Sequence, residues 1–195
     1  MASKRRSTTA ADAPETTAKR QTWLILIYRV PTEPTRHRAA VWRRLRNLGA
    51  VYLQNSVAAM PRTADSERAM RALRNEIVEK MDGKAFLLTS SALAGESDMV
   101  AIVNAARDDE YEEILDKCRD FHRELSKEVA TEHFTYGELE ENEEDLNKLL
   151  GWFQKVRARD SLGSSKAVTV EQALVGCSTA LEEFAARVYA AEDES

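Results

Sequence analysis

Residues Trp23–Pro61, "WLILIYRVPTEPTRHRAAVWRRLRNLGAVYLQNSVAAMP", decide the fold that we expect for this chain. The first six residues form an almost continuous apolar run without a helical period, which is typical of a central strand buried on both faces. Pro34 and Thr35 then supply a helix start, with Thr35 as the expected N-cap, and Gly49 supplies the stop. The rest of the stretch is strand-like, and "QNS" in its middle leaves open whether residues 51–61 form one bent strand or two.

The pattern of strands and helices continues as far as residue 92. Apolar residues at helical spacing predict a second helix over residues 63–81, and "KAFLLTS" predicts a further strand. A small sheet with two helices on one face, in the order strand, helix, strand or hairpin, helix, strand, is the ferredoxin-like arrangement. We therefore expect a ferredoxin-like α+β domain over residues 21–92.

The spacing of the apolar residues changes after residue 97. Three rows of them recur at helical spacing, and the breaks between the rows fall at "TEHFTYG" and "SLGSSKAVT". The third helix is expected to open with Thr169 and Gln172, which have the spacing of a capping box. The expected fold class is α+β, in which a helical extension of about three long helices over residues 97–191 follows the sheet domain.

The chain divides into two parts of opposite charge. Its 195 residues carry a formal net charge of −5, but residues 1–90 carry +9 and residues 91–195 carry −14. The basic part can attract a polyanion, whereas the acidic part would repel one or shield the basic face. Residues 1–20 are rich in Ser, Thr, Ala and charge and predict a disordered basic tail, whose Lys4, Arg5 and Arg6 either add phosphate contacts or remain solvated.

No segment indicates a membrane protein or a secreted protein. The longest apolar run, "TWLILIY", is far shorter than the ~20 residues that a membrane-spanning helix needs, and its position fits no secretory signal. Cys118 and Cys177 lie 59 positions apart and outside any CxxC pattern. We expect them to be reduced core thiols, and the alternative is a thiol-based sensor that includes His122. The expected protein is soluble and cytoplasmic, without a membrane partner.

Residue types with catalytic or metal-binding chemistry form no recognisable motif. The acidic run from Glu138 to Lys148 fits the first turns of a helix, where the macrodipole favours acids, and it lacks the ligand spacing of a calcium loop. The chain has neither a nucleophile elbow nor a glycine-rich phosphate loop. We therefore expect no catalytic residue, no metal ligand, no cofactor and no enzymatic activity.

The helix expected after Pro34 carries five arginines and no acid. Arg36 and Arg43 fall opposite its apolar stripe, and Arg46 falls on the polar shoulder. Because a guanidinium donates two hydrogen bonds to a phosphate and keeps its charge, this helix predicts contact with a DNA backbone. The alternative is a solvated face that pairs with the acidic helices downstream. The full set of expected DNA-binding residues is Arg29, Arg36, Arg38, Arg43, Arg44, Arg46 and Arg62.

Two long blocks of the sequence resemble one known family. Residues 23–61 are similar to the opening of the N-terminal domain of the chromate resistance protein ChrB family, and "FTYGELEENEEDLNKLLGWFQKVRARD" followed by "LEEFAARVY" is similar to its end. The resemblance covers Trp23 to Ala190 and implies a transcriptional regulator of chromate efflux whose N-terminal domain contacts operator DNA. Full-length members carry a further domain linked to the chromate response. Because this chain stops before that domain, DNA binding is the part of the family's function that we expect it to retain.

A wider resemblance, through the first strand, the arginine-rich helix and "QNSV", is to PaaX-type repressors and to small CRISPR-associated ferredoxin-like nucleases. In those nucleases an acidic residue at the end of the first strand supports a metal. The corresponding residue here is Arg29, which cannot ligate a cation and opposes its binding. We therefore expect a DNA-binding regulator or accessory protein of metal-oxyanion resistance. The alternative is a non-enzymatic interaction module, either a homodimer or a partner of a separate chromate-sensing chain.

Overall fold

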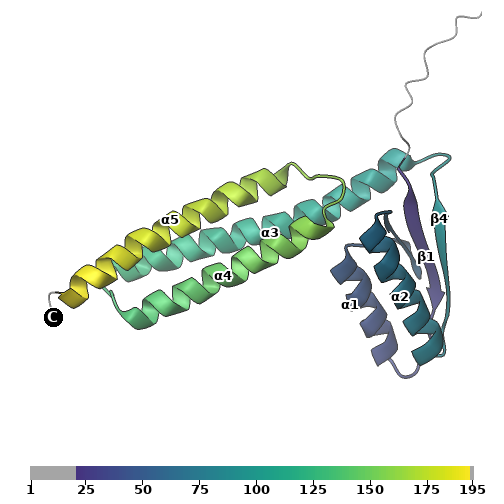
Figure 1. The fold of residues 1–195 in the computed structure, drawn as a ribbon, viewed down its shortest axis with the longest axis horizontal. Coiled ribbons are helices and arrows are strands. Elements are labelled where there is room, and N and C mark those ends of the chain that lie inside the picture. Colours follow the sequence, from purple (N-terminus) through teal and green to yellow (C-terminus); the bar gives the residue numbers. More distant parts are fainter. Residues whose placement is uncertain (1–20, 194–195) are drawn as a thin grey trace, which may run out of the picture.

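The structure is a computed structural model that describes residues 21–193. The tail expected over residues 1–20 lies outside the described residues. Four strands and two helices precede three long helices, as Figure 1 shows. In chain order the elements are β1 (Trp23–Arg29), α1 (Arg36–Leu48), β2 (Val51–Gln54), β3 (Val57–Pro61), α2 (Ala64–Lys80), β4 (Lys84–Ser90), α3 (Glu96–Ala130), α4 (Tyr136–Arg159) and α5 (Lys166–Asp193).

The sheet has the strand order β2-β3-β1-β4, and every neighbouring pair is antiparallel. Helices α1 and α2 lie side by side on one face of it (Figure 1). This topology confirms the expected α+β class with a ferredoxin-like sheet domain. β1 occupies a central position, because its residue Ile25 is paired with Ala59 on one side and with Leu88 on the other.

Residues 51–61 form two strands, and a two-residue turn joins them. Ser56 in the turn has φ +63°, in the left-handed region that hairpin turns use. The pairing of β2 with β3 also shifts register between Tyr52 and Gln54. Of the two alternatives that "QNS" left open, two strands is therefore the one present, with a tight turn and an irregular ladder between them.

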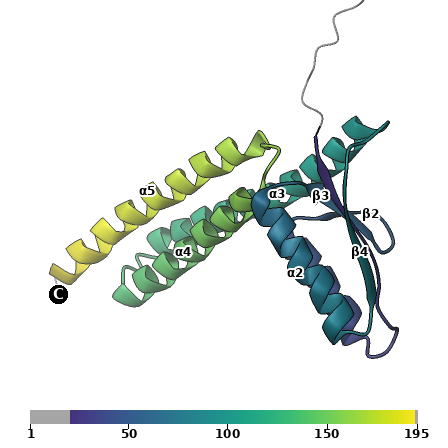
Figure 2. The same ribbon diagram turned by 45° about the vertical axis from the view of Figure 1, so that its right-hand side comes forward.

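The expectation that β1 is buried on both faces is wrong for its second half. Leu24 and Leu26 are fully buried beneath α1 and α2, but Ile27 on the opposite face is 40% exposed. That opposite face is covered only near Trp23, because α3 starts there and then leaves the sheet, as Figure 2 shows. The continuous apolar run thus includes side chains that remain in contact with solvent.

Local sequence explains how α1 ends and how α2 begins. Gly49 ends α1 with φ +81°, the left-handed conformation that glycine adopts without steric cost. Thr35 occupies the expected N-cap position of α1, although its side chain makes no capping hydrogen bond. At α2, Thr63 and Ser66 form a reciprocal capping box.

The extension contains the three expected long helices, whose shared core includes Tyr111, Phe153 and Phe184. The expected start of the third helix is wrong, because α5 begins at Lys166, three residues before Thr169. The polar loop before α5 supplies the cap instead. The Lys166 N–H donates to Ser164 Oγ at 3.1 Å, and Asp160 in turn accepts from the Ser164 N–H.

Helix α3 connects the two parts of the molecule. Near its N-terminus Val103 packs with Trp23 and Val51 on the open face of the sheet, whereas from Tyr111 onward α3 belongs to the bundle core. The long helix therefore leaves the sheet and carries α4 and α5 away from it (Figure 1).

An ion cluster around the buried Arg107 lies at the same junction. Glu110 accepts from Arg107 Nη1 at 2.5 Å and from Arg159 Nη2 at 2.7 Å, which links α3 to the end of α4. A Cβ at Gly49 would lie 3.0 Å from Arg159 Cδ and 3.3 Å from Arg107 Nη1. The turn after α1 thus packs directly against the two arginines.

Cys118 and Cys177 are buried and unpaired, which confirms the expected core thiols. The Cys177 thiol lies 3.8 Å from the Cys118 carbonyl oxygen, between α3 and α5. Within residues 21–193 no helix combines the length and the apolar character that crossing a bilayer requires.

Replacement of Phe153 by alanine tests the bundle core. Phe153 is buried and its ring centroid lies 6.2 Å from that of Tyr111. We expect Phe153→Ala to lower the free energy of unfolding by about 3–5 kcal/mol, measured by thermal or urea denaturation. The neighbouring Gln154→Ala is the control, because Gln154 is exposed and such sites change stability by only ~0.5 kcal/mol or less. Equal effects of the two changes would contradict this packing.

Replacement of Glu110 by alanine tests the junction. Burial lowers the pKa of Arg107 and Glu110 opposes this shift, so loss of the carboxylate leaves two neighbouring cations without their shared partner. We expect Glu110→Ala to destabilise the protein by about 3–5 kcal/mol in the same denaturation assay. Glu113→Ala, at an exposed position of α3, should be neutral. A neutral Glu110→Ala would show that the cluster does not hold the junction.

Candidate nucleic-acid interface

Helix α1 presents its arginines to solvent and its apolar stripe to the sheet. Val41 and Leu45 are fully buried, and the helix contains no acidic residue. The structure exposes all five arginines of α1, as the helical period predicted, namely Arg36, Arg38, Arg43, Arg44 and Arg46. Arg29, at the end of β1, is exposed as well. The result is a cationic surface beside the sheet.

These six arginines have no ion-pair partner anywhere in residues 21–193. The acidic run of α4 does not neutralise them: within residues 21–193 none of its acids pairs with these arginines, and its Asp145 and Glu144 pair with Lys148, at 2.8 and 3.6 Å. The alternative in which α1 pairs with the acidic helices is therefore absent from the described part of the chain. Unpaired surface guanidinium groups remain available to an anionic ligand.

Two of the six arginines line a hollow of about 630 Å³ at one end of the sheet. Arg29 comes from the last position of β1 and Arg38 from the first turn of α1, where its Nη2 donates to Thr32 Oγ1 at 2.9 Å. Three aromatic residues complete much of the wall, and the turn between β2 and β3 closes the hollow. The other lining residues are Tyr28, Val30, Thr32, Trp42, Tyr52, Asn55 and Ser56.

The hydroxyl groups of Tyr28 and Tyr52 lie 2.8 Å apart in this hollow. Burial, followed by the hydrogen bond with Tyr28, raises the pKa of Tyr52 well above its usual range. Both hydroxyls are protonated at neutral pH, as a tyrosine ordinarily is, and because one donates to the other, the pair keeps one hydrogen for a ligand. No carboxylate is among the residues that line the hollow, so it suits an anion rather than a divalent cation.

Trp42 links the hollow to the exposed face of α1. It is 49% exposed, and the guanidinium carbon of Arg46 lies 5.5 Å from its ring centroid. This distance is within the range of a cation–π contact. The contact orients Arg46 along the helix surface without neutralising its charge.

The structure brings some of the expected residues together and separates others. Arg29 and Arg38 line the hollow together with Trp42, and Arg46 lies over the Trp42 ring. Arg43 and Arg44 line a second, smaller hollow between α1 and α2. Arg36 begins α1 and is exposed there.

Arg62 lies apart from this group. Its backbone N–H donates to Thr22, just before the start of β1, whereas Arg29 ends the same strand. Its side chain is also engaged, because Arg62 Nε donates to Glu67 Oε2 at 2.7 Å. Within residues 21–193, Arg62 is therefore the one expected residue that both lies away from the hollow and already has an ion-pair partner.

Sequence reasoning missed the aromatic residues of the hollow. Tyr28 directly precedes Arg29 at the end of β1, which could have marked it as a neighbour of the site. Tyr52 comes from β2, two strands away in the sheet. Its hydroxyl meets that of Tyr28 across the intervening strand β3, and this long-range approach has no signal in the sequence.

Comparison with known proteins shows the family to which this chain belongs. No curated protein matches the chain. Residues 38–195 match the family described as "Protein ChrB, N-terminal", which is associated with chromate resistance. The match includes most of α1, the hairpin, α2, β4 and the whole helical extension. Since it spans well over half of the chain, this protein belongs to the ChrB N-terminal family.

Proposed function

We propose that this chain is a DNA-binding transcriptional regulator or accessory protein of chromate resistance, and that it contacts DNA through α1 and the adjacent hollow. The observation that carries this proposal is the group of six exposed arginines without ion-pair partners in residues 21–193. In an otherwise acidic chain, such a surface is the electrostatic footprint of a polyanion partner. Membership of the ChrB family supports chromate resistance as the setting.

The dimensions of α1 suit a DNA groove. Arg36 and Arg46 lie ten positions apart, which corresponds to about 15 Å along a helix axis. The major groove is about 12 Å wide, so arginines at the two ends of α1 can reach phosphates on both sides of it. Such phosphate contacts would position the domain on a duplex without reading its sequence.

The hollow adds uncharged groups to this cationic surface. One hydroxyl of the Tyr28–Tyr52 pair and the Asn55 side chain can donate to phosphate oxygens. Trp42 offers an exposed ring for apolar contact with a sugar or a thymine methyl. These groups lie beside Arg29 and Arg38 rather than among acids. They are our candidates for contacts at the edge of the DNA.

The acidic extension would orient the protein on DNA. Residues 91–195 carry −14, and α4 and α5 extend away from α1 (Figure 1). Repulsion between these helices and the phosphates favours an approach in which the sheet domain meets the duplex first. The charge separation in the sequence thus has a direct role in the proposed complex.

A second role as an interaction module is favoured by the open face of the sheet. Phe86 is 64% exposed and is paired across the strands with Ile27, and Leu88 beside it is also exposed. An exposed apolar face of this kind fits a protein partner, either a second copy or a separate chromate-sensing chain. It lies opposite the face covered by α1 and α2, so the two roles use different surfaces.

We also propose that the chain is not a nuclease. Arg29 stands where the related nucleases carry a carboxylate, and no carboxylate is among the lining residues of the hollow. Purified protein incubated with Mg²⁺ or Mn²⁺ should leave DNA and RNA intact on a denaturing gel. Cleavage that a chelator abolishes would contradict the absence of enzymatic activity.

The double change Arg43→Ala, Arg46→Ala tests the DNA-binding proposal. Removing one phosphate contact should flatten the slope of log affinity against log salt by about one unit. We expect weaker binding to the chain's own upstream region and to random duplexes alike, measured by fluorescence anisotropy over a range of salt. The melting temperature should change little, because both side chains are exposed and off the apolar stripe.

The matched control is Arg68→Ala, Arg71→Ala, which removes the same charge from α2. Both residues are exposed and already paired, Arg68 with Asp65 and Arg71 with Glu67. This control should keep most of the salt dependence. If both double variants lose affinity equally, net charge rather than the α1 surface determines binding. An unchanged affinity of Arg43→Ala, Arg46→Ala would rule out α1 as the contact surface.

A further inference from the structure

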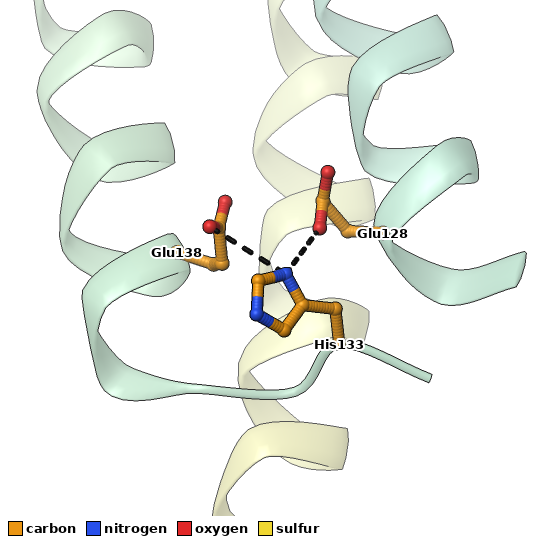
Figure 3. A group of neighbouring side chains, drawn as sticks. All are labelled: Glu128, His133 and Glu138. Atoms are coloured by element: carbon orange, nitrogen blue, oxygen red, sulfur yellow. Dashed lines mark hydrogen bonds and ion pairs between the residues drawn. The ribbon is translucent and has the colours of Figure 1, made fainter. Parts of the chain in front are cut away.

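Three ligand-type side chains converge at the end of the bundle that lies far from the sheet. Glu128 lies in the last turn of α3, His133 in the turn that follows, and Glu138 in the first turn of α4 (Figure 3). The His133 Nδ1 lies 2.8 Å from Glu128 Oε2 and 3.6 Å from Glu138 Oε1. One ligand atom from each residue falls within 4.8 Å of the other two. No sequence motif predicted a metal ligand here.

Backbone capping motifs fix all three residues. Glu132 has φ +54°, its N–H donates to the Val129 carbonyl, and the His133 N–H donates to the Glu128 carbonyl. This is the Schellman motif, which places Glu128 and His133 at the positions that usually make an apolar contact. Thr135 caps α4 by accepting from the Glu138 N–H at 3.3 Å. Backbone hydrogen bonds thus hold the three residues in defined positions.

The protein groups around the cluster leave its negative charge only partly neutralised. Both carboxylates approach the same ring nitrogen (Figure 3), and one Nδ1–H can donate a good hydrogen bond to only one of them. The Glu128 side chain is only 8% exposed, so solvent reaches it poorly. Lys127 Nζ lies 3.4 Å from the other Glu128 oxygen but is closer to Glu124, at 2.8 Å.

We propose that Glu128, His133 and Glu138 bind a divalent metal ion that is intermediate between hard and soft in its ligand preference. Zn²⁺ is such an ion and is the probe. Zinc bonds of about 2.0–2.2 Å to nitrogen and oxygen place neighbouring ligands of a tetrahedral site about 3.3 Å apart. The observed separations of 2.8 and 3.6 Å bracket that spacing, so small side-chain shifts suffice. Water supplies the fourth ligand.

The donor set discriminates between ions. One imidazole nitrogen and two carboxylate oxygens suit Zn²⁺ and its first-row neighbours, whereas Mg²⁺ and Ca²⁺ require more oxygen ligands. An oxyanion such as chromate is repelled by the two carboxylates. A bound cation joins the last turn of α3 to the first turn of α4. It takes the place of the proton on His133 Nδ1, and the neutral imidazole then carries its proton on Nε2. Its position is remote from α1 (Figure 1), so this site is independent of DNA binding.

The test measures Zn²⁺ binding to the full chain after treatment with a chelator, by competition with a chromophoric zinc indicator. We expect one saturable site in the wild-type chain. His133→Gln and Glu138→Gln should each weaken it at least ~10-fold. Glu138→Gln keeps the backbone N–H that Thr135 caps, so circular dichroism should show that it folds normally. Co²⁺ bound in place of Zn²⁺ should give visible absorption bands that His133→Gln abolishes.

The controls replace the same residue types elsewhere. His122→Gln changes an exposed histidine of α3, and Glu140→Gln changes an exposed acid of α4. Both should bind Zn²⁺ as the wild type does. The proposal is overturned if the wild-type chain shows no saturable Zn²⁺ site, or if folded His133→Gln and Glu138→Gln variants retain wild-type affinity. Loss of binding in His122→Gln alone would place the ion elsewhere and would equally reject this site.

Discussion

Helix α3 belongs to two hydrophobic cores at once, and this constraint determines how the basic and acidic parts of the molecule are arranged. Its first turns cover Trp23 on the open face of the sheet, and its remainder forms the bundle with α4 and α5. The Glu110 cluster and the close approach of Gly49 to Arg159 reinforce the same junction. Because one continuous helix spans both cores, the bundle extends away from the sheet domain (Figure 1), and the end of α4 reaches the turn after α1.

This arrangement explains how an acidic protein keeps a cationic helix free. The bundle satisfies many of its own charges within single helices, through pairs such as Asp116 with Arg119 and Asp145 with Lys148. Pairs three or four positions apart form wherever a helix places opposite charges on one side. Helix α1 has no acid of its own, so its arginines lack such partners. The charge balance of each helix, rather than that of the whole chain, sets what each surface can bind.

Much of the fold could be predicted from the apolar patterns along the chain. These patterns show the order of strands and helices, and that order is what indicates a ferredoxin-like domain. The true start of α5 was missed because Thr169 and Gln172 fit a capping box, yet Ser164 and Asp160 in the preceding loop make the actual cap. The solvent exposure of Ile27 was missed as well, since an apolar run does not show how far a neighbouring helix covers it.

The candidate sites, like the fold, could be predicted from the sequence only in part. The exposure of the α1 arginines follows from helical period alone, whereas the hollow requires Tyr52 to reach Tyr28 across an intervening strand. The contact of Arg107 with Arg159 through Glu110 joins positions far apart in the chain and has no local signal. Likewise Glu128, His133 and Glu138 recur at intervals of five, which no single helical face explains, and only the turn between α3 and α4 brings them together.

The proposed function depends most on where DNA meets the protein, at α1 and the adjacent hollow. Hydrogen–deuterium exchange of the full chain, with and without a duplex at low salt, tests this most directly because it reports every part of the backbone. We predict slower exchange on DNA binding in α1 and in the β2–β3 turn around Asn55, with α4 and α5 unchanged. Protection confined to the bundle or to the open face of the sheet, or no protection at all, would contradict it.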